Sequence, residues 1–287
     1  MRYVLLGLGS AFAVLFIIQL NRGKRYETVV NSINGQEYPL CDLYGVGFCW
    51  SNTSLFAFSG KKASVLKSQA AMLYDLQYAE YYANVVWAQT LTFTHLFLTV
   101  TFLMSGMMYD TAMFMLIAGI FLTILVSSYC YSNMKNTLDK RTEECESQLP
   151  EVVSTMAVLV NSGMVLREAW ETISKNGTGA FYTLMQKACE NMNNGCSDSD
   201  AVFLLGKASN STEIKKFTSA LLQSMEKGGG ELKGFLAQQS SELWKTKRQV
   251  MLQGGEKAAT KLLLPIVLIF IGIIIIIMTA AFAGSLF

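Results

Sequence analysis

Long stretches without a charged residue constrain this chain more than any other feature of its sequence. A helix needs about 20 mostly apolar residues to cross the roughly 30 Å hydrocarbon core of a bilayer. Four stretches meet this requirement: 3–20, 87–108, 111–131 and 262–286. The sequence therefore predicts a protein with four transmembrane helices.

The composition agrees with a membrane protein. Of the 287 residues, 52% are hydrophobic and only 15% are charged, whereas an average soluble domain has about 25% charged residues. The mean hydropathy is +0.33. These values exclude a disordered chain and argue against an ordinary soluble enzyme. The net charge of +2 gives no indication of nucleic-acid binding, which requires a strong basic excess.

The first apolar stretch has two interpretations. Arg2 followed by an apolar core also fits a cleaved signal peptide. However, no A-x-A-like site precedes the polar region, and Arg22, Lys24 and Arg25 follow the apolar core at once. Because basic residues just after a span stay on the cytoplasmic side, we expect a signal anchor with its N-terminus outside.

Basic residues also predict the orientation of the whole chain. Residues 21–86 contain six Lys and Arg residues and residues 135–261 contain sixteen. The loop between the second and third spans carries only Asp110, and the C-terminal tail carries no charge. The positive-inside rule then predicts a cytoplasmic (inner) membrane protein with both segments cytoplasmic and both termini outside. Arg2 argues mildly against this orientation.

Residues 135–261 show the periodicity of amphipathic helices. Pro150 fits the first turn of a helix that ends at 161–163, and a second helix over 165–175 places Trp170 in the core with Val153, Leu166 and Phe217. Further helices are expected at 181–192, at 200–205, from Asn210 to Gly228 and from Glu231 into the last span. Asn210 with Glu213 resembles a capping box. The sequence predicts an all-α cytoplasmic bundle of about six helices before the last span.

The first cytoplasmic segment is less informative. An amphipathic helix from about residue 64 is expected to run directly into the second span, with tyrosines and Trp87 at the membrane interface. Residues 34–60 are loop-rich and suggest no assignment.

The sequence contains few residues that could form a catalytic, cofactor or metal site. The six cysteines lack the short spacing of zinc sites, and a cytoplasmic location argues against disulfides. The glycines at 228–230 could form a phosphate-binding nest, but a turn between helices explains them better. The only histidine, His95, lies in the second span. We therefore expect no enzymatic activity, cofactor or metal.

Two segments resemble a known family. LPEVVSTMAVLVNSGMVLREAWETIS is similar to the opening hairpin of the type II secretion F domain, and KGGGELKGFLAQQSSELWKTKRQVMLQGGEKAATKLLLPIVLIF is similar to its closing part. The similarity covers about 135–287. The preceding spans and the segment LYDLQYAEYYANVVWAQ resemble the tight-adherence (Flp) pilus branch, particularly its TadC-like members. Nothing is recognised in 26–62.

This resemblance implies a membrane platform protein at the base of a pilus or secretion machine. It implies contacts with a cytoplasmic assembly ATPase, a sister platform protein (TadB-like) and pilin transmembrane helices, in a homo- or hetero-oligomer within the lipid bilayer. Partner contacts are expected at the hairpin and the glycine-rich turn, on Pro150, Gly163, Arg167, Glu168, Gly228 and Gly230. Arg167 and Glu168 are expected on the exposed side of their helix.

A different class of protein remains as an alternative. A small multi-pass transporter or channel subunit could use His95 as an intramembrane polar site, since ionisable residues within a bilayer usually have a function. The other polar groups of this span are threonines and Ser105, which suit hydrogen bonds between helices.

Overall fold

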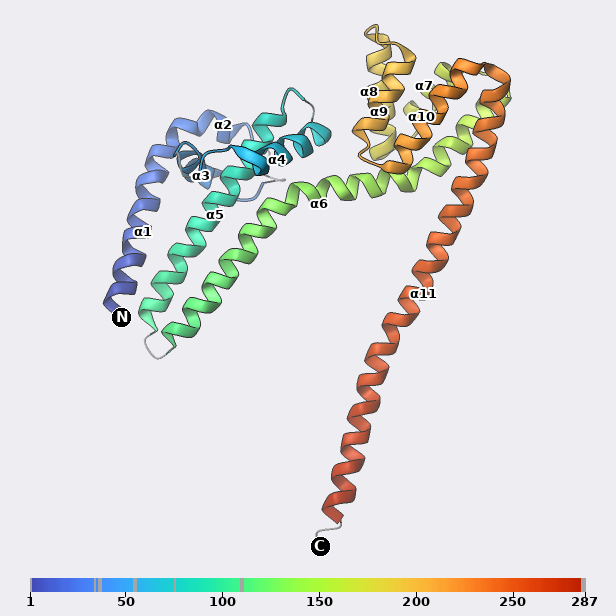
Figure 1. The fold of residues 1–287 in the computed structure, drawn as a ribbon. Coiled ribbons are helices and arrows are strands. Elements are labelled where there is room, and N and C mark those ends of the chain that lie inside the picture. The colour runs from blue at the N-terminus through green and yellow to red at the C-terminus, as the bar shows by residue number, and fades with distance from the viewer. Residues whose placement is uncertain are drawn as a thin grey trace. The chain divides into compact units, whose positions relative to one another are not determined.

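The computed structural model describes residues 2–33, 35, 38–53, 56–74, 76–108 and 111–284 (Figure 1). Every regular element in these ranges is a helix, which confirms the expected all-α fold. The chain divides into two compact units, Met1–Glu143 and Glu144–Phe287.

The first unit is built around helix α5 (Ala79–Met107), which packs against α1, α3 and α4. One apolar core lies between these helices, and Tyr44, Leu66, Ala83 and Val85 are among its buried residues. The other elements of the unit are α1 (Arg2–Gly23), η1 (Lys24–Tyr26), α2 (Glu27–Asn31), η2 (Cys41–Leu43), α3 (Tyr44–Ser51), α4 (Gly60–Leu73) and the first part of α6 (Ala112–Asn161).

The expected continuous helix into the second span is wrong. Helix α4 ends at Leu73, and α5 begins only at Ala79. The Leu73 carbonyl oxygen accepts a hydrogen bond from Arg141 Nη1 at 3.2 Å, and the Tyr74 ring stacks on Tyr82 with centroids 3.7 Å apart. Arg141 lies 68 residues beyond Leu73, so local periodicity could not reveal its contact with the end of α4.

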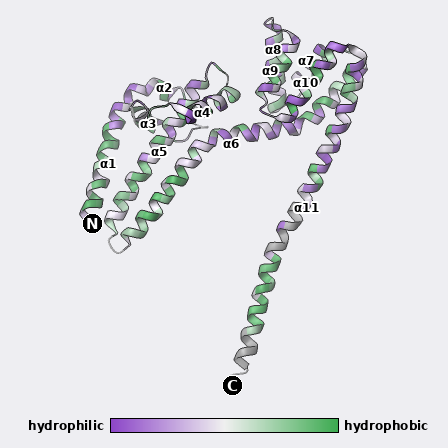
Figure 2. Cartoon of the chain, in the orientation of Figure 1, coloured by the Kyte–Doolittle hydropathy of each residue, from purple (hydrophilic) through white to green (hydrophobic). Residues whose placement is uncertain are grey.

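Three helices are long and apolar enough to cross a membrane: Tyr3–Asn31, Ala79–Met107 and Ala112–Asn161. They cover the first three predicted spans apart from one residue each at Met108 and Thr111. Figure 2 shows hydrophobic residues along α1, the first part of α6 and the later part of α11. Within the described residues of α11, the apolar stretch is Pro265–Met278. The predicted fourth span continues past the last described residue, and Asp110 also lies outside the described residues.

Helix α6 continues from the third apolar stretch into the second unit without a break. Pro150 lies inside it, so the helix start predicted near Pro150 is wrong. A proline within a helix removes one backbone hydrogen bond and costs about 3 kcal/mol. The flanking Leu149, Val152 and Val153 are almost completely buried, and each such burial contributes about 1.5–3 kcal/mol, which offsets the cost.

The second unit confirms the predicted helices, with ends that differ by a few residues. They are α7 (Leu166–Asn176), α8 (Ala180–Asn193), α9 (Asp198–Ala208), α10 (Thr212–Lys227) and α11 (Gly229–Gly284). The capping residue of α10 is Ser211, one residue beyond the predicted Asn210. Ser211 Oγ accepts hydrogen bonds from the backbone N–H groups of Glu213 at 3.1 Å and Ile214 at 3.2 Å, while Asn210 takes a left-handed φ of 56°.

Candidate functional site

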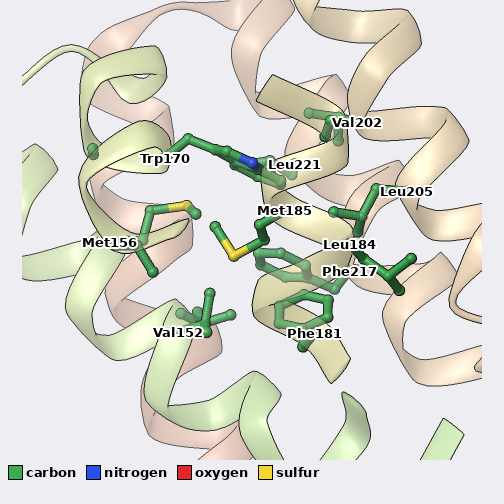
Figure 3. Packing of buried hydrophobic residues seen from close by; sticks show 14 of the residues in the cluster. Val152, Met156, Trp170, Phe181, Leu184, Met185, Val202, Leu205, Phe217 and Leu221 are labelled. Atoms are coloured by element: carbon green, nitrogen blue, oxygen red, sulfur yellow. The ribbon is translucent and has the colours of Figure 1, made fainter. Parts of the chain in front are cut away.

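A single apolar core holds the bundle of the second unit together. Trp170 is 1% exposed, and Figure 3 shows its indole lying among labelled side chains that belong to α6, α8, α9 and α10. This confirms the predicted burial of Trp170 with Val153 and Phe217, while Leu166 is partly buried against the same core. The labelled members of the cluster are Val152, Met156, Trp170, Phe181, Leu184, Met185, Val202, Leu205, Phe217 and Leu221.

Side chains from α6 cap the first turn of α8. Glu144 Oε1 accepts a hydrogen bond from the Ala180 backbone N–H at 2.9 Å, and Gln148 Oε1 accepts one from the Phe181 N–H at 2.9 Å. The first N–H groups of a helix have no partner within the helix, so outside acceptors stabilise its start. Gly179 at the start of α8 has no side chain that could do this, and the cap is therefore supplied from a distant part of the sequence.

Glu168 and Arg167 both reach solvent as expected, with the Arg167 side chain 40% exposed, but Arg167 also binds neighbouring helices. Glu168 is exposed on α7. Arg167 Nη1 donates to Asp198 Oδ1 at 3.1 Å, and its Nη2 donates to Asn193 Oδ1 at 3.3 Å. Arg167 therefore links α7 to the α8–α9 turn, and its charge is engaged in the fold. Exposed ion pairs of this kind contribute about 0.2–1 kcal/mol each.

The other predicted contact residues occupy different environments. Pro150 is buried within α6. Gly163 follows α6 with a φ of +104°, and Gly228 separates α10 from α11 with a φ of +107°, so both turns need the left-handed freedom of glycine. Gly230 lies in the first turn of α11. Their contact with a partner stays a prediction.

His95 is fixed by two hydrogen bonds within the first unit. Trp50 Nε1 donates to His95 Nδ1 at 3.0 Å, and His95 Nε2 lies 3.2 Å from the Phe12 carbonyl oxygen. Since Nδ1 accepts, the ring proton belongs on Nε2, which donates to Phe12. His95 is 6% exposed and joins α1, α3 and α5 as a neutral imidazole, which is the arrangement of a structural histidine.

The threonines of α5 also bond within the structure. Thr90, Thr92, Thr94, Thr99 and Thr101 each donate to the backbone carbonyl four residues earlier, at 2.6–2.8 Å. Such bonds satisfy a hydroxyl donor inside an apolar helix. Thr92 Oγ1 in addition accepts from the Gly47 backbone N–H at 3.0 Å, so it helps to hold α3.

Helix α3 is the feature of the first unit that sequence reasoning missed. It packs against both α1 and α5, within a segment that had no assignment. A Cβ at Gly47 would lie 1.9 Å from the Ala88 carbonyl oxygen, and one at Gly45 would lie 3.0 Å from Gly23 Cα. The two glycines, spaced by one residue in an apolar run, were a signal of close backbone approach.

The described cysteines are all free thiols. Cys145 and Cys189 are buried, whereas Cys196 is partly exposed. Across the described ranges, no group of three or more His, Cys, Asp or Glu side chains is placed to hold a metal ion.

The comparison with protein families matches the second unit. Residues 152–283 match the family model described as type II secretion system (T2SS), protein F. No curated protein and no solved structure matches the chain. The matched region begins in α6 and includes α7 to α10 and nearly all of α11, which agrees with the resemblance noted from the sequence. Residues 152–283 are thus similar to the type II secretion protein F domain, and this match together with the apolar helices indicates an inner-membrane protein.

Proposed function

We propose that this chain is a membrane platform protein of a type II secretion or type IV pilus assembly machine. The observation that carries the proposal is the match of residues 152–283 to the type II secretion protein F family, because that domain occurs in platform proteins of these machines. In this role the chain converts no substrate. It couples a cytoplasmic assembly ATPase to pilin subunits in the membrane.

The finer assignment is to the tight-adherence (Flp) branch, as a TadC-like protein. It rests on the order of parts, with two apolar helices directly before the domain and one at its end, and on the tyrosine-rich segment before the second span. The proposal includes a TadB-like sister protein and assembly into a homo- or hetero-oligomer.

The proposed topology has four spans, with the fourth over 262–286. Helix α11 supports it, because it runs from the bundle through Pro265–Met278 without interruption. The side chains of Ile266, Phe270 and Ile276 are 59–69% exposed, and lipid is the solvent that suits an exposed apolar helix. Residues 21–86 and 135–261 lie in the cytoplasm and both termini lie outside.

Co-purification from detergent-extracted membranes tests the proposal. The assembly ATPase is expected to elute with the tagged full chain. Glu168→Lys reverses an exposed charge on α7 and is expected to weaken this association and increase its salt sensitivity. Glu226→Lys makes the same change on α10 and serves as the control. Complete absence of the ATPase from the eluate of the unaltered chain contradicts the proposal.

The transporter alternative has less support. A residue that carries protons or solute through the membrane must exchange partners, and His95 has both ring nitrogens engaged by Trp50 and Phe12. A histidine that fixes three helices to one another fits a scaffold better.

A further inference from the structure

A polar groove of about 500 Å³ lies beside α6, α7 and the turn that leads to α8. It is separate from the residues expected to contact partners. Its walls include Glu151 and Thr155 of α6, Thr172 and Asn176 of α7, and Tyr182 of α8.

Two glycines shape this groove. A Cβ at Gly177 would lie 2.0 Å from the Tyr182 ring, and one at Gly179 would lie 1.9 Å from Gln148 Nε2. The Tyr182 ring therefore packs directly over the backbone of the α7–α8 turn. Since Gln148 also binds the start of α8, the end of the groove is held in place by the helix cap and is formed before any ligand arrives.

The polar groups in the groove have unused capacity to accept hydrogen bonds. Tyr182 is 8% exposed, yet the contacts of the described residues include no hydrogen bond to its hydroxyl. Burial and the nearby Glu151 carboxylate raise the pKa of Tyr182, so the phenol stays neutral. Thr155, Thr172 and the Asn176 amide nitrogen all donate to carbonyls of their own helices, so the side-chain oxygen atoms of these residues keep the capacity to accept hydrogen bonds.

The groove also carries a negative charge. Glu151 is exposed and is the one charged residue among those that line the groove. No ion pair involves it in the described part of the chain. A site with one free carboxylate and several neutral acceptors suits a cation that offers many donors. A guanidinium group is such a cation, because its five N–H donors lie in a fixed plane.

We propose that this groove binds an arginine side chain from an extended segment of a protein partner, with Glu151 as the counter-ion and the Tyr182 and Asn176 oxygen atoms as further acceptors. The inference rests on the proposed function to the extent that a platform protein works by binding other proteins. It adds a site and a ligand chemistry that the family match does not supply.

A titration of the full chain in nanodiscs tests this site. The chain is labelled with fluorotyrosine, and the fluorine resonance of Tyr182 is assigned by its loss in Tyr182→Phe. The probe is acetyl-Gly-Arg-Gly-amide, and the control probe replaces arginine with the uncharged citrulline. The arginine probe is expected to shift the Tyr182 resonance saturably, with citrulline at least about tenfold weaker, as for loss of a charged hydrogen bond.

Two matched variants complete the test. Glu151→Gln is expected to weaken the arginine probe about tenfold, whereas Glu226→Gln, an equal change at an exposed residue of α10 outside the groove, leaves it unchanged. Equal binding of both probes, no shift with either, or full affinity in Glu151→Gln overturns the inference. If the ATPase still co-purifies in that case, the proposed function stands without the groove. If the arginine probe binds but the ATPase does not co-purify, the proposed function fails and the groove remains.

Discussion

Trp170 is the single side chain on which the domain core depends most. It is the largest fully buried residue, so Trp170→Ala is expected to lower the free energy of unfolding by about 3–5 kcal/mol. Its Nε1 is buried without a hydrogen-bond partner among the described residues. Trp170→Phe removes this unsatisfied donor, whose burial costs about 1–3 kcal/mol, and is expected to cost clearly less than the alanine change.

Thermal or chemical unfolding of the full chain in detergent measures both changes. It is followed by far-UV circular dichroism, because this signal does not require Trp170 as a probe. Equal destabilisation by Trp170→Phe and Trp170→Ala would show that the indole nitrogen has a partner that the packing does not reveal.

The cysteines of the second unit give a prediction about reactivity and pH. Thiolate is the form that reacts with a maleimide. Burial raises the pKa of the Cys189 thiol, so Cys189 is expected to react slowly near neutral pH and faster as the pH rises toward that pKa. Cys196 is partly exposed and is expected to react first.

Mass spectrometry of the labelled protein after a pH series checks this order. In cells, an impermeant maleimide is expected to reach Cys196 only after permeabilisation if the proposed topology holds. Labelling of Cys196 in intact cells contradicts that topology, and Cys145, which is completely buried, is unsuitable as a probe.

At the scale of single residues, the sequence did not predict contacts that depend on a side chain from a distant part of the chain. The sequence reasonably predicted that Trp170 is buried, since helical periodicity places it on the apolar face. It could not reveal that Arg167 binds Asp198, because α7 and α9 meet only through the fold. Asn210 and Ser211 are both good capping residues, and the left-handed turn at Asn210 decided between them.

At the scale of helices, α3 gives the sharpest prediction. Gly47→Ala places a Cβ 1.9 Å from the Ala88 carbonyl oxygen, so α3 must move away from α5. We expect a loss of stability of about 1–3 kcal/mol, the usual cost of overpacking. The bond from Trp50 to His95 should weaken as well.

Thermal unfolding and the fluorescence spectrum of Trp50 in an otherwise Trp-to-Phe background measure these effects. Gly7→Ala in α1 is the matched control, because a Cβ there meets no atom within 4 Å. Equal stability of the two variants contradicts the close packing of α3 on α5.

Helices were predictable from the sequence to the degree that they are long and periodic. The apolar runs identified α1, α5 and the start of α6, and the stripe of apolar residues identified α7, α8 and α10. The short α3 carries too few turns for a pattern, and the end of α4 is bound by Arg141, which lies far along the chain. Helix α6 continues through Pro150 because the burial of the neighbouring side chains in the core outweighs the preference of proline for the first turn of a helix.

For the molecule as a whole, sequence and structure agree on an all-helical chain with apolar helices and a helical domain. The family resemblance agrees with the match over residues 152–283. The polar groove could not have been predicted, because its lining residues belong to three helices and its shape depends on two glycines in one turn.

The central claim is that the chain is a scaffold for surface assembly and that His95 has a structural role. Cells that lack the chain are complemented with the unaltered protein or with His95→Gln, and surface pili or secreted protein are quantified. A glutamine amide can accept from Trp50 and donate to Phe12, but it cannot carry a proton. We expect assembly to be lost without the chain and restored by both proteins. Assembly that persists without the chain, or that His95→Gln abolishes while the protein remains folded in the membrane, contradicts the account.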